Sequence, residues 1–176
     1  MDPAEAGGRA LSAILRQVLL VTALCLPAWV QAGVAVGEAA PEVTLPQLPG
    51  EDAVSLSSLR GKVVYLDFWA SWCGPCRVSF PQLEALRAEL GGQGFEVYAI
   101  NVDEVEDDAL RFLAELPVNY LVVRDGSGAT PQAWGILGMP TGYLIDRQGV
   151  VRKVHQGYKK SDGERLRAEI VELLGE

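Results

Sequence analysis

Two cysteines separated by two residues are the side chains best suited to chemistry in this sequence. Cys73 and Cys76 stand in the run Trp72-Cys73-Gly74-Pro75-Cys76. The thiolate is the reactive form of cysteine, and two thiols at this spacing can close a small disulfide ring and reopen it by exchange. An inert structural bridge is the alternative, but a ring with two intervening residues restrains little chain. The spacing therefore favours a redox-active pair.

Metal and haem chemistry need ligands that this sequence lacks near the pair. A structural zinc site takes four ligands, and the chain has 3 cysteines and 1 histidine. Cys25 lies in the N-terminal segment, and His155 is distant in sequence and reads as a strand residue. A c-type haem site needs histidine directly after the second cysteine, where this chain has Arg77. We expect no metal and no cofactor.

The cysteines lie where a strand ends and a helix begins. Residues 62–67 are apolar and β-branched, and residues 77–90 carry apolar side chains at helical spacing. Free N–H groups and the helix dipole stabilise an anion at such a junction. We expect Cys73 at the helix entrance with its sulfur exposed, Cys76 in the first turn, and a kink at Pro81 inside the helix.

The segment resembles the active site of the thioredoxin superfamily. The Trp-Cys-Gly-Pro-Cys pattern is intact, and residues 66–73 are similar to the secreted TlpA/ResA-like and cytochrome c maturation branch. The resemblance covers roughly residues 37–174. It implies an α/β thioredoxin fold with an N-terminal β-hairpin and a strand-helix insert.

The remaining periodicity predicts alternating strands and helices. The order βαβ followed by ββα predicts a central mixed sheet with helices on both faces. Asp103 with Glu106, and Ser161 with Glu164, have the spacing of helix N-terminal capping boxes. The predicted strands are 40–45, 53–56, 95–102, 120–124, 142–146 and 150–155, and the predicted helices are 103–116, 131–137 and 161–174.

Two acidic residues are candidates for proton transfer or tuning. The resemblance implies that Asp67, which shares a strand face with Tyr65 and Trp69, is buried beneath the cysteines. Burial would raise its pKa and suit it to take the proton of Cys76; a surface carboxylate is the alternative. Glu104 is similar in place to a glutamate that approaches the disulfide in ResA-like reductases, and an acidic first helical turn is the other interpretation.

Substrate contacts are also implied by the resemblance. Met139 and Pro140 match the loop that faces the cysteines, where the Xaa-Pro bond is cis and the main chain pairs with an extended substrate. A trans proline in an ordinary turn is the alternative. Gly142 departs from the usual branched or hydroxylated residue. The predicted substrate-binding residues are Trp72, Gly74, Pro75, Met139 and Pro140, with Trp72 at the rim and Trp69 in the core.

Composition and the N-terminal pattern limit the class of protein to which this chain can belong. The 176 residues suffice for one domain, and the net charge of −8 argues against nucleic acid as a partner. Residues 1–32 have the basic start, the short apolar run and the small-residue end of a signal peptide. An uncleaved anchor formed by residues 10–30 is the alternative. We expect a linker at 33–40 and the thioredoxin-like domain at 41–176.

These features predict an exported, periplasmic thiol-disulfide oxidoreductase that is a monomer. The Gly-Pro dipeptide between the cysteines matches the reducing thioredoxins, so the resemblance implies a reductase of protein disulfides supplied with electrons by an inner-membrane donor. A dithiol oxidant, or a binding or chaperone module that kept the fold, is the alternative. The sequence does not identify the client proteins.

Overall fold

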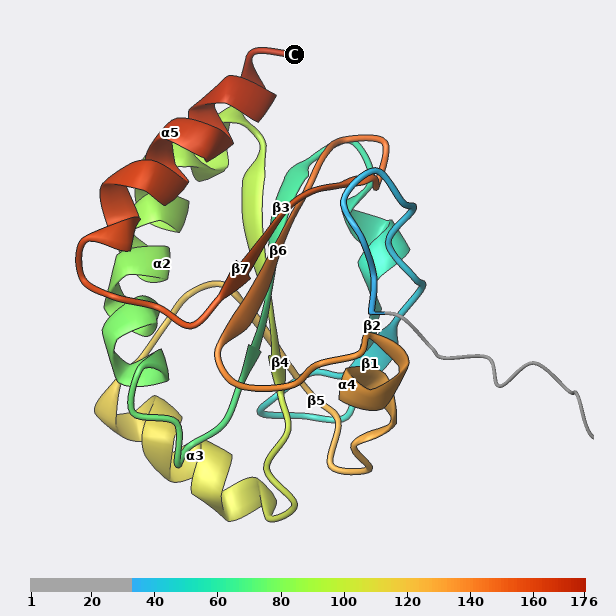
Figure 1. The fold of residues 1–176 in the computed structure, drawn as a ribbon. Coiled ribbons are helices and arrows are strands. Elements are labelled where there is room, and N and C mark those ends of the chain that lie inside the picture. The colour runs from blue at the N-terminus through green and yellow to red at the C-terminus, as the bar shows by residue number, and fades with distance from the viewer. Residues whose placement is uncertain (1–32) are drawn as a thin grey trace, which may run out of the picture. The chain divides into compact units, whose positions relative to one another are not determined.

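The computed structural model describes residues 33–176 (Figure 1). The predicted signal segment lies outside these residues. Within them, no helix is both long and apolar enough to cross a membrane.

A five-stranded mixed sheet forms the centre of the domain (Figure 1). Its strand order is β5-β4-β3-β6-β7. The middle strand β3 pairs in parallel with β4 and antiparallel with β6, so the predicted mixed sheet is confirmed. Every residue of β3 is buried, as expected for a strand covered on both faces. The strands are β3 (Val63–Trp69), β4 (Phe95–Asn101), β5 (Leu121–Arg124), β6 (Thr141–Ile145) and β7 (Val151–Gln156).

The three longer helices pack on one face of this sheet. They are α2 (Cys76–Leu90), α3 (Glu106–Glu115) and α5 (Asp162–Leu174). Their apolar residues form one core cluster with side chains of β3 and β4. Helix α2 is continuous through Pro81, and it begins at Cys76. Pro81 therefore lies inside the helix, as the sequence predicts.

The opposite face is covered by shorter elements. They are the hairpin β1 (Thr44–Pro46) and β2 (Ala53–Ser55), the 3-10 helix η1 (Leu56–Leu59) and the short α4 (Ala129–Ala133). The predicted hairpin and the strand-helix insert β5-α4 are thus present, and the fold class is confirmed. Helix α4 is shorter than the predicted 131–137. Trp134 at its end is buried in a second core cluster, which these shorter elements form with the sheet.

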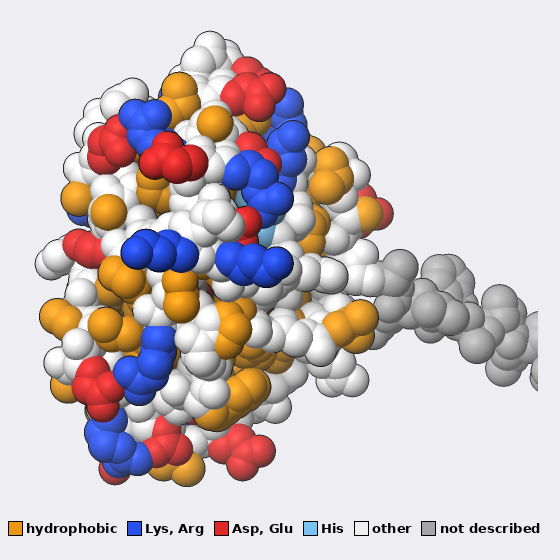
Figure 2. All heavy atoms as spheres, turned by 60° about the vertical axis from the view of Figure 1, so that its left-hand side comes forward, with side chains coloured by type: hydrophobic (Ala, Val, Ile, Leu, Met, Phe, Trp, Pro, Cys, Tyr) orange, Lys and Arg blue, Asp and Glu red, His pale blue; other side chains and the backbone are white. Residues whose placement is uncertain are grey.

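The surface over α2 and α5 mixes both charge signs. Figure 2 shows acidic and basic side chains interspersed with hydrophobic ones across this face. One cross-helix ion pair joins Arg167 of α5 to Glu89 of α2, with Nε 3.0 Å from Oε1. Charges on this side therefore pair locally and form no continuous basic face of the kind that binds nucleic acid.

Both predicted capping boxes are wrong. Helix α3 begins at Glu106 after Val105, without a side-chain cap. The Asp103 carboxylate is buried and bound to other groups, as described below, so it cannot cap this helix. Ser161 makes no capping hydrogen bond either, and the backbone N–H of Lys159 donates to the Asp162 carboxylate instead.

Residues 33–40, which the sequence suggests as a linker, bind to the domain. The N–H of Gly37 donates to the carbonyl of Val151 at 2.8 Å, and the N–H of Ala40 donates to that of Gly149 at 2.9 Å. Ala40 is buried in the second core cluster. This segment therefore runs along the domain surface beside β7.

Gly142 is where the chain departs from the residue usual in the resembling family, and packing explains it. A Cβ atom at position 142 would lie 2.0 Å from the hydroxyl oxygen of Tyr65 and 2.3 Å from Cζ of the same ring. The Tyr65 ring is wholly buried and fills the space over the glycine. Only glycine fits beneath this tyrosine.

We predict that Gly142→Ala lowers the free energy of unfolding by about 1–3 kcal/mol, because the added methyl forces the buried Tyr65 ring to shift. Urea denaturation measures this loss. Gly92→Ala is the matched control, since a Cβ there meets nothing within 4 Å. Equal stabilities of the two variants would contradict the packing described for Tyr65.

Candidate functional site

Cys73 and Cys76 form a disulfide at the junction of β3 and α2. The S–S distance is 1.98 Å and the Cα atoms are 5.3 Å apart. Cys73 lies in the turn that follows β3, and Cys76 is the first residue of α2. The backbone N–H of Cys76 donates to the Cys73 sulfur at 3.2 Å. An N–H of the first helical turn therefore points at the Cys73 sulfur, where it would stabilise negative charge.

The two cysteines differ slightly in accessibility. Cys73 is 4% exposed and Cys76 is 0% exposed, and both belong to the core cluster that contains Trp69 and Phe80. The expected exposure of the Cys73 sulfur is therefore wrong for the bonded state, because the residue packs against this cluster. Of the two cysteines, Cys73 alone keeps any exposed surface.

The turn before the cysteines is held by a carboxylate from the next strand. Asp103, buried two residues after the end of β4, accepts the Ser71 N–H at 3.0 Å and the Ser71 hydroxyl at 3.0 Å. It also accepts the Asn101 side-chain amide at 2.8 Å. Asp103 thus positions the segment that carries Cys73. The sequence held one signal for this role: Asp103 directly follows the strand that neighbours β3 in parallel.

Asp67 lies in the middle of β3 and is 1% exposed. Burial raises the pKa of this carboxyl well above its ordinary value of 3.8. Its Oδ2 atom has no hydrogen-bond partner in the described part of the chain. The predicted burial of Asp67 is confirmed, and its neighbours Tyr65 and Trp69 belong to the same core cluster as the cysteines.

The loop before β6 lies at the same end of the sheet as the cysteines. Thr141 pairs with Phe68, near the end of β3, which places Pro140 beside the start of the cysteine turn. The Met139–Pro140 bond is cis, as predicted. Met139 packs against the cysteine-containing cluster. The loop borders a surface hollow of about 260 Å³ lined by Leu137, Gly138, Met139, Thr141, Gln156 and Gly157.

The other predicted site residues occupy different surroundings. Trp72 is 71% exposed beside the disulfide, whereas Trp69 is fully buried. Gly74 and Pro75 are exposed between the cysteines. Glu104 is exposed and precedes the first turn of α3. Its carbonyl accepts a hydrogen bond from Arg124 at 2.7 Å. The role of the Glu104 side chain stays a prediction.

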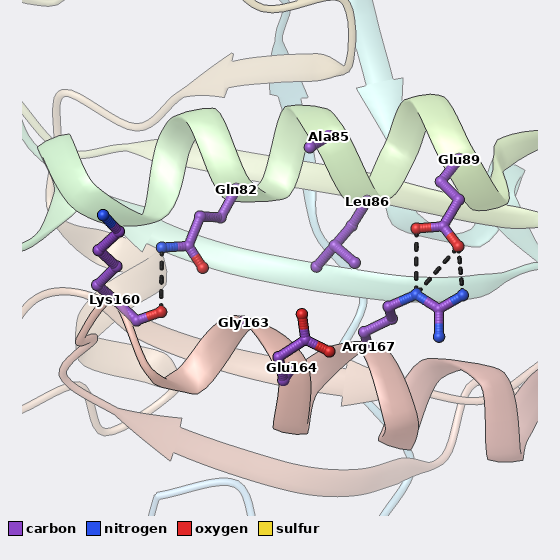
Figure 3. Close-up of a pocket in the computed structure, with 8 residues that line it drawn as sticks. All are labelled: Gln82, Ala85, Leu86, Glu89, Lys160, Gly163, Glu164 and Arg167. Atoms are coloured by element: carbon purple, nitrogen blue, oxygen red, sulfur yellow. Dashed lines mark hydrogen bonds and ion pairs between the residues drawn. The ribbon is translucent and has the colours of Figure 1, made fainter.

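A second surface hollow lies away from these residues. It has a volume of about 230 Å³ and runs between α2 and α5 (Figure 3). Gln82 donates to the Lys160 carbonyl across it, and the pair of Glu89 and Arg167 closes its other end. None of the predicted site residues lines this hollow.

Comparison with known proteins identifies the family of this chain. The family model described as Redoxin matches residues 35–170. The chain belongs to the Redoxin family. Thiol-disulfide oxidoreductase ResA of Oceanobacillus iheyensis is 37% identical over 125 residues, which cover 69% of this chain and 65% of that protein, just under two thirds of its length. ResA of Bacillus subtilis is 36% identical over 121 residues, covering 69% and 67%.

Solved structures agree with this placement. A Chlorobium tepidum protein provisionally named as the thiol:disulfide interchange protein DsbE superposes with a TM-score of 0.78 at 45% identity, covering 81% of this chain and 100% of the other. A thiol:disulfide interchange protein from Bacteroides sp. has a TM-score of 0.70 at 25% identity, covering 81% and 92%. This member of the Redoxin family is thus ResA-like in sequence and belongs to the thioredoxin superfamily, and its relatives are named thiol-disulfide oxidoreductases.

We predict that Asp103→Asn lowers the free energy of unfolding by about 2 kcal/mol. The asparagine amide lacks the negative charge that strengthens the hydrogen bonds from Ser71. Its NH2 group would also face the N–H groups of Ser71 and Asn101, which are themselves donors. Chemical denaturation tests it against Asp52→Asn, a change at an exposed carboxyl of the hairpin turn. Should both variants keep the wild-type stability, Asp103 does not hold the turn.

We predict that Asp67→Asn stabilises the protein increasingly as pH rises. Between 3.8 and the raised pKa, the folded protein keeps the Asp67 proton that the unfolded chain loses, so the wild-type free energy of unfolding falls with pH. The asparagine variant does not lose stability in this way. The difference between its free energy of unfolding and that of the wild type therefore grows by about 1.4 kcal/mol per pH unit within the window.

Denaturation of both proteins from pH 4 to pH 8 measures this difference. Asp52→Asn serves again as the exposed control and should follow the wild-type curve. Parallel curves for wild type and Asp67→Asn would show that Asp67 has no raised pKa.

Proposed function

We propose that this oxidoreductase is exported to the periplasm and reduces protein disulfides through Cys73 and Cys76. One observation supports it above all: the bonded pair stands at a helix N-terminus, where Cys76 is fully buried and Cys73 keeps a 4% exposed surface. This asymmetry suits a mechanism in which one sulfur meets the substrate and the other, shielded, completes the exchange.

The proposed reaction uses the reduced form of the pair. The Cys73 thiolate attacks one sulfur of a substrate disulfide, forming a mixed disulfide and releasing the other substrate sulfur as a thiolate. Cys76 loses its proton and attacks the Cys73 sulfur. The Cys73–Cys76 bond forms, the mixed disulfide breaks, and the second substrate sulfur leaves as a thiolate. Two electrons have then passed from the dithiol to the substrate, and an inner-membrane donor restores the dithiol.

Asp67 is the proposed acceptor of the Cys76 proton. Its carboxyl is buried on the strand that leads into the cysteine turn, and burial raises its pKa well above the ordinary value of 3.8, which makes it a stronger base than an exposed carboxylate. A base with a pKa near the working pH transfers protons efficiently in both directions. Cys76 is fully buried, so a base within the protein is needed.

The surface beside the disulfide suits a protein substrate. Trp72 presents a large exposed ring next to Cys73, and Leu137 is exposed in the loop before Pro140. We propose that an extended substrate segment lies between these side chains and pairs with the Met139 main chain, touching Gly74 and Pro75. Exposed apolar side chains of this kind commonly mark a protein-binding surface.

Direction and location rest on the sequence. Gly74 and Pro75 match the dipeptide of reducing thioredoxins, and residues 1–32 have the pattern of a signal peptide. The ResA relatives are named thiol-disulfide oxidoreductases and share sequence with this domain, which is compatible with the assignment. Glu104 is retained as a proposed tuning residue.

We predict that the domain catalyses insulin reduction by dithiothreitol, that Cys73→Ser abolishes the catalysis, and that Cys76→Ser accumulates a mixed disulfide on Cys73. The equilibrium with glutathione should place the potential closer to about −270 mV, as in thioredoxin, than to about −120 mV, as in DsbA. Thiol trapping and mass spectrometry provide both measurements.

Three results would count against this function. Cysteine-independent or absent turnover would indicate a binding module. A potential near that of DsbA would indicate an oxidant. A mixed disulfide on Cys76 would reverse the proposed roles of the two sulfurs.

A further inference from the structure

We propose that Tyr65 and His155 carry the proton of Asp67 to solvent, forming a relay across three strands of the sheet. The inference rests on the proposed role of Asp67 as the proton acceptor for Cys76. It assigns a function to two residues that the mechanism above does not use.

The strand register places Asp67 and His155, the two ends of the proposed relay, on one row across the sheet. Asp67 of β3 pairs with Gly142 of β6, and Gly142 pairs with His155 of β7. Residues that face each other across neighbouring strands point to the same side of a sheet. Asp67 and His155 therefore flank Gly142 on the face that carries α2 and α5.

The gap over Gly142 is filled by a hydroxyl group. The Tyr65 hydroxyl lies where a side chain of residue 142 would begin, 2.0 Å from the Cβ position. The Tyr65 ring stacks on the His155 ring, with centroids 5.8 Å apart and planes at 29°. A group that can both donate and accept a proton thus lies between the carboxyl and the imidazole.

Unpartnered polar atoms mark both ends of this gap. Asp67 Oδ2 and His155 Nδ1 are buried and have no hydrogen-bond partner in the part of the chain that the structure describes. Buried polar atoms are nearly always bonded, so two such exceptions on one row call for an explanation. The Tyr65 hydroxyl is hydrogen-bonded to neither atom while the cysteines are joined, so the relay requires both side chains to turn onto this hydroxyl when the proton moves.

The far end of the row reaches the surface. His155 Nε2 lies 2.8 Å from Glu169 Oε2 of α5, and these side chains are 12% and 18% exposed. A small surface pocket is lined by His155 and by Tyr158, Asp162, Arg165, Gly157 and Leu166. Water can therefore approach the imidazole.

The charges around His155 suit it for transfer. Burial lowers the pKa of His155 below 6.5, the charge of Glu169 opposes this, and Arg165 adds to it, while Asp162 acts in the same direction as Glu169. The ring is thus neutral at pH 7, with one nitrogen free to accept a proton. Tyr65 and Tyr158 face it from β3 and from the loop after β7, and burial raises the pKa of both phenols.

The steps balance as follows. The proton of Cys76 passes to the Asp67 carboxylate as the thiolate attacks Cys73. The Asp67 proton then moves to the Tyr65 oxygen while the hydroxyl proton of Tyr65 moves to His155 Nδ1. The imidazolium releases its Nε2 proton to Glu169 or to water. One proton leaves the protein, and Asp67 and Tyr65 return to their starting forms. His155 is left protonated on Nδ1, so exchange of its ring protons with water must restore the Nε2–H tautomer before the next cycle.

The test is the rate at which a mixed disulfide on Cys73 resolves. Reduced protein attacks Ellman's reagent, and the second release of thionitrobenzoate in a stopped-flow experiment reports the attack by Cys76. We expect Tyr65→Phe and His155→Gln to slow this release about tenfold at pH 7. Tyr143→Phe, whose hydroxyl binds the Trp134 carbonyl in the other core cluster, should keep the wild-type rate.

Chemical rescue keeps the test independent of any loss of packing. We expect free imidazole to restore the slowed release in His155→Ala, because it can enter the surface pocket beside the vacated position, while sodium chloride at equal ionic strength does not. Wild-type rates for Tyr65→Phe and His155→Gln, or no rescue by imidazole, would overturn the relay.

Asp67→Asn separates the two hypotheses in the same assay. If this variant resolves slowly while the Tyr65 and His155 variants resolve at the wild-type rate, only the relay fails. If Asp67→Asn itself resolves at the wild-type rate, the proposed role of Asp67 fails and the relay fails with it.

Discussion

Burial of one carboxyl group in the central strand is the constraint that shapes this site. Asp67 lies in a strand whose residues are all buried, and desolvation raises the pKa of its carboxyl well above the ordinary value of 3.8. Such a group destabilises the fold at neutral pH. The surrounding residues are arranged so that the carboxyl is retained there: Gly142 opens space beside it and the Tyr65 ring occupies that space. The cysteine turn begins two residues after the end of the same strand.

The chemistry depends on how that strand is continued. Between Trp69 and Cys76 the chain changes from strand to helix, and a carboxylate of the neighbouring strand, Asp103, holds the turn through Ser71. The disulfide is therefore placed by bonds from two adjacent parallel strands rather than by the helix alone. A rigid turn is what an exchange reaction needs, because its sulfurs must return to one geometry in every cycle.

Much of this arrangement was predictable from the sequence. The CxxC spacing between a β-branched run and a helical run located the junction, and the resemblance to thioredoxins supplied the buried Asp67 and the cis Pro140. Local capping rules failed at Asp103 because a tertiary bond to Ser71, 32 residues away in sequence, outcompetes the helix end. The burial of Cys73 and the alignment of Asp67 with His155 depend on packing and register between strands, which no local pattern encodes.

The carboxyl of Asp67 is also where the account can be tested most directly. Its ¹³C chemical shift, followed against pH in the oxidised and the reduced protein, reports its protonation. We predict a midpoint well above 3.8 in both states, and a different midpoint in the reduced protein, where the proposed proton exchange couples Asp67 to Cys76. A midpoint near 3.8 that is the same with the cysteines bonded or free would contradict it.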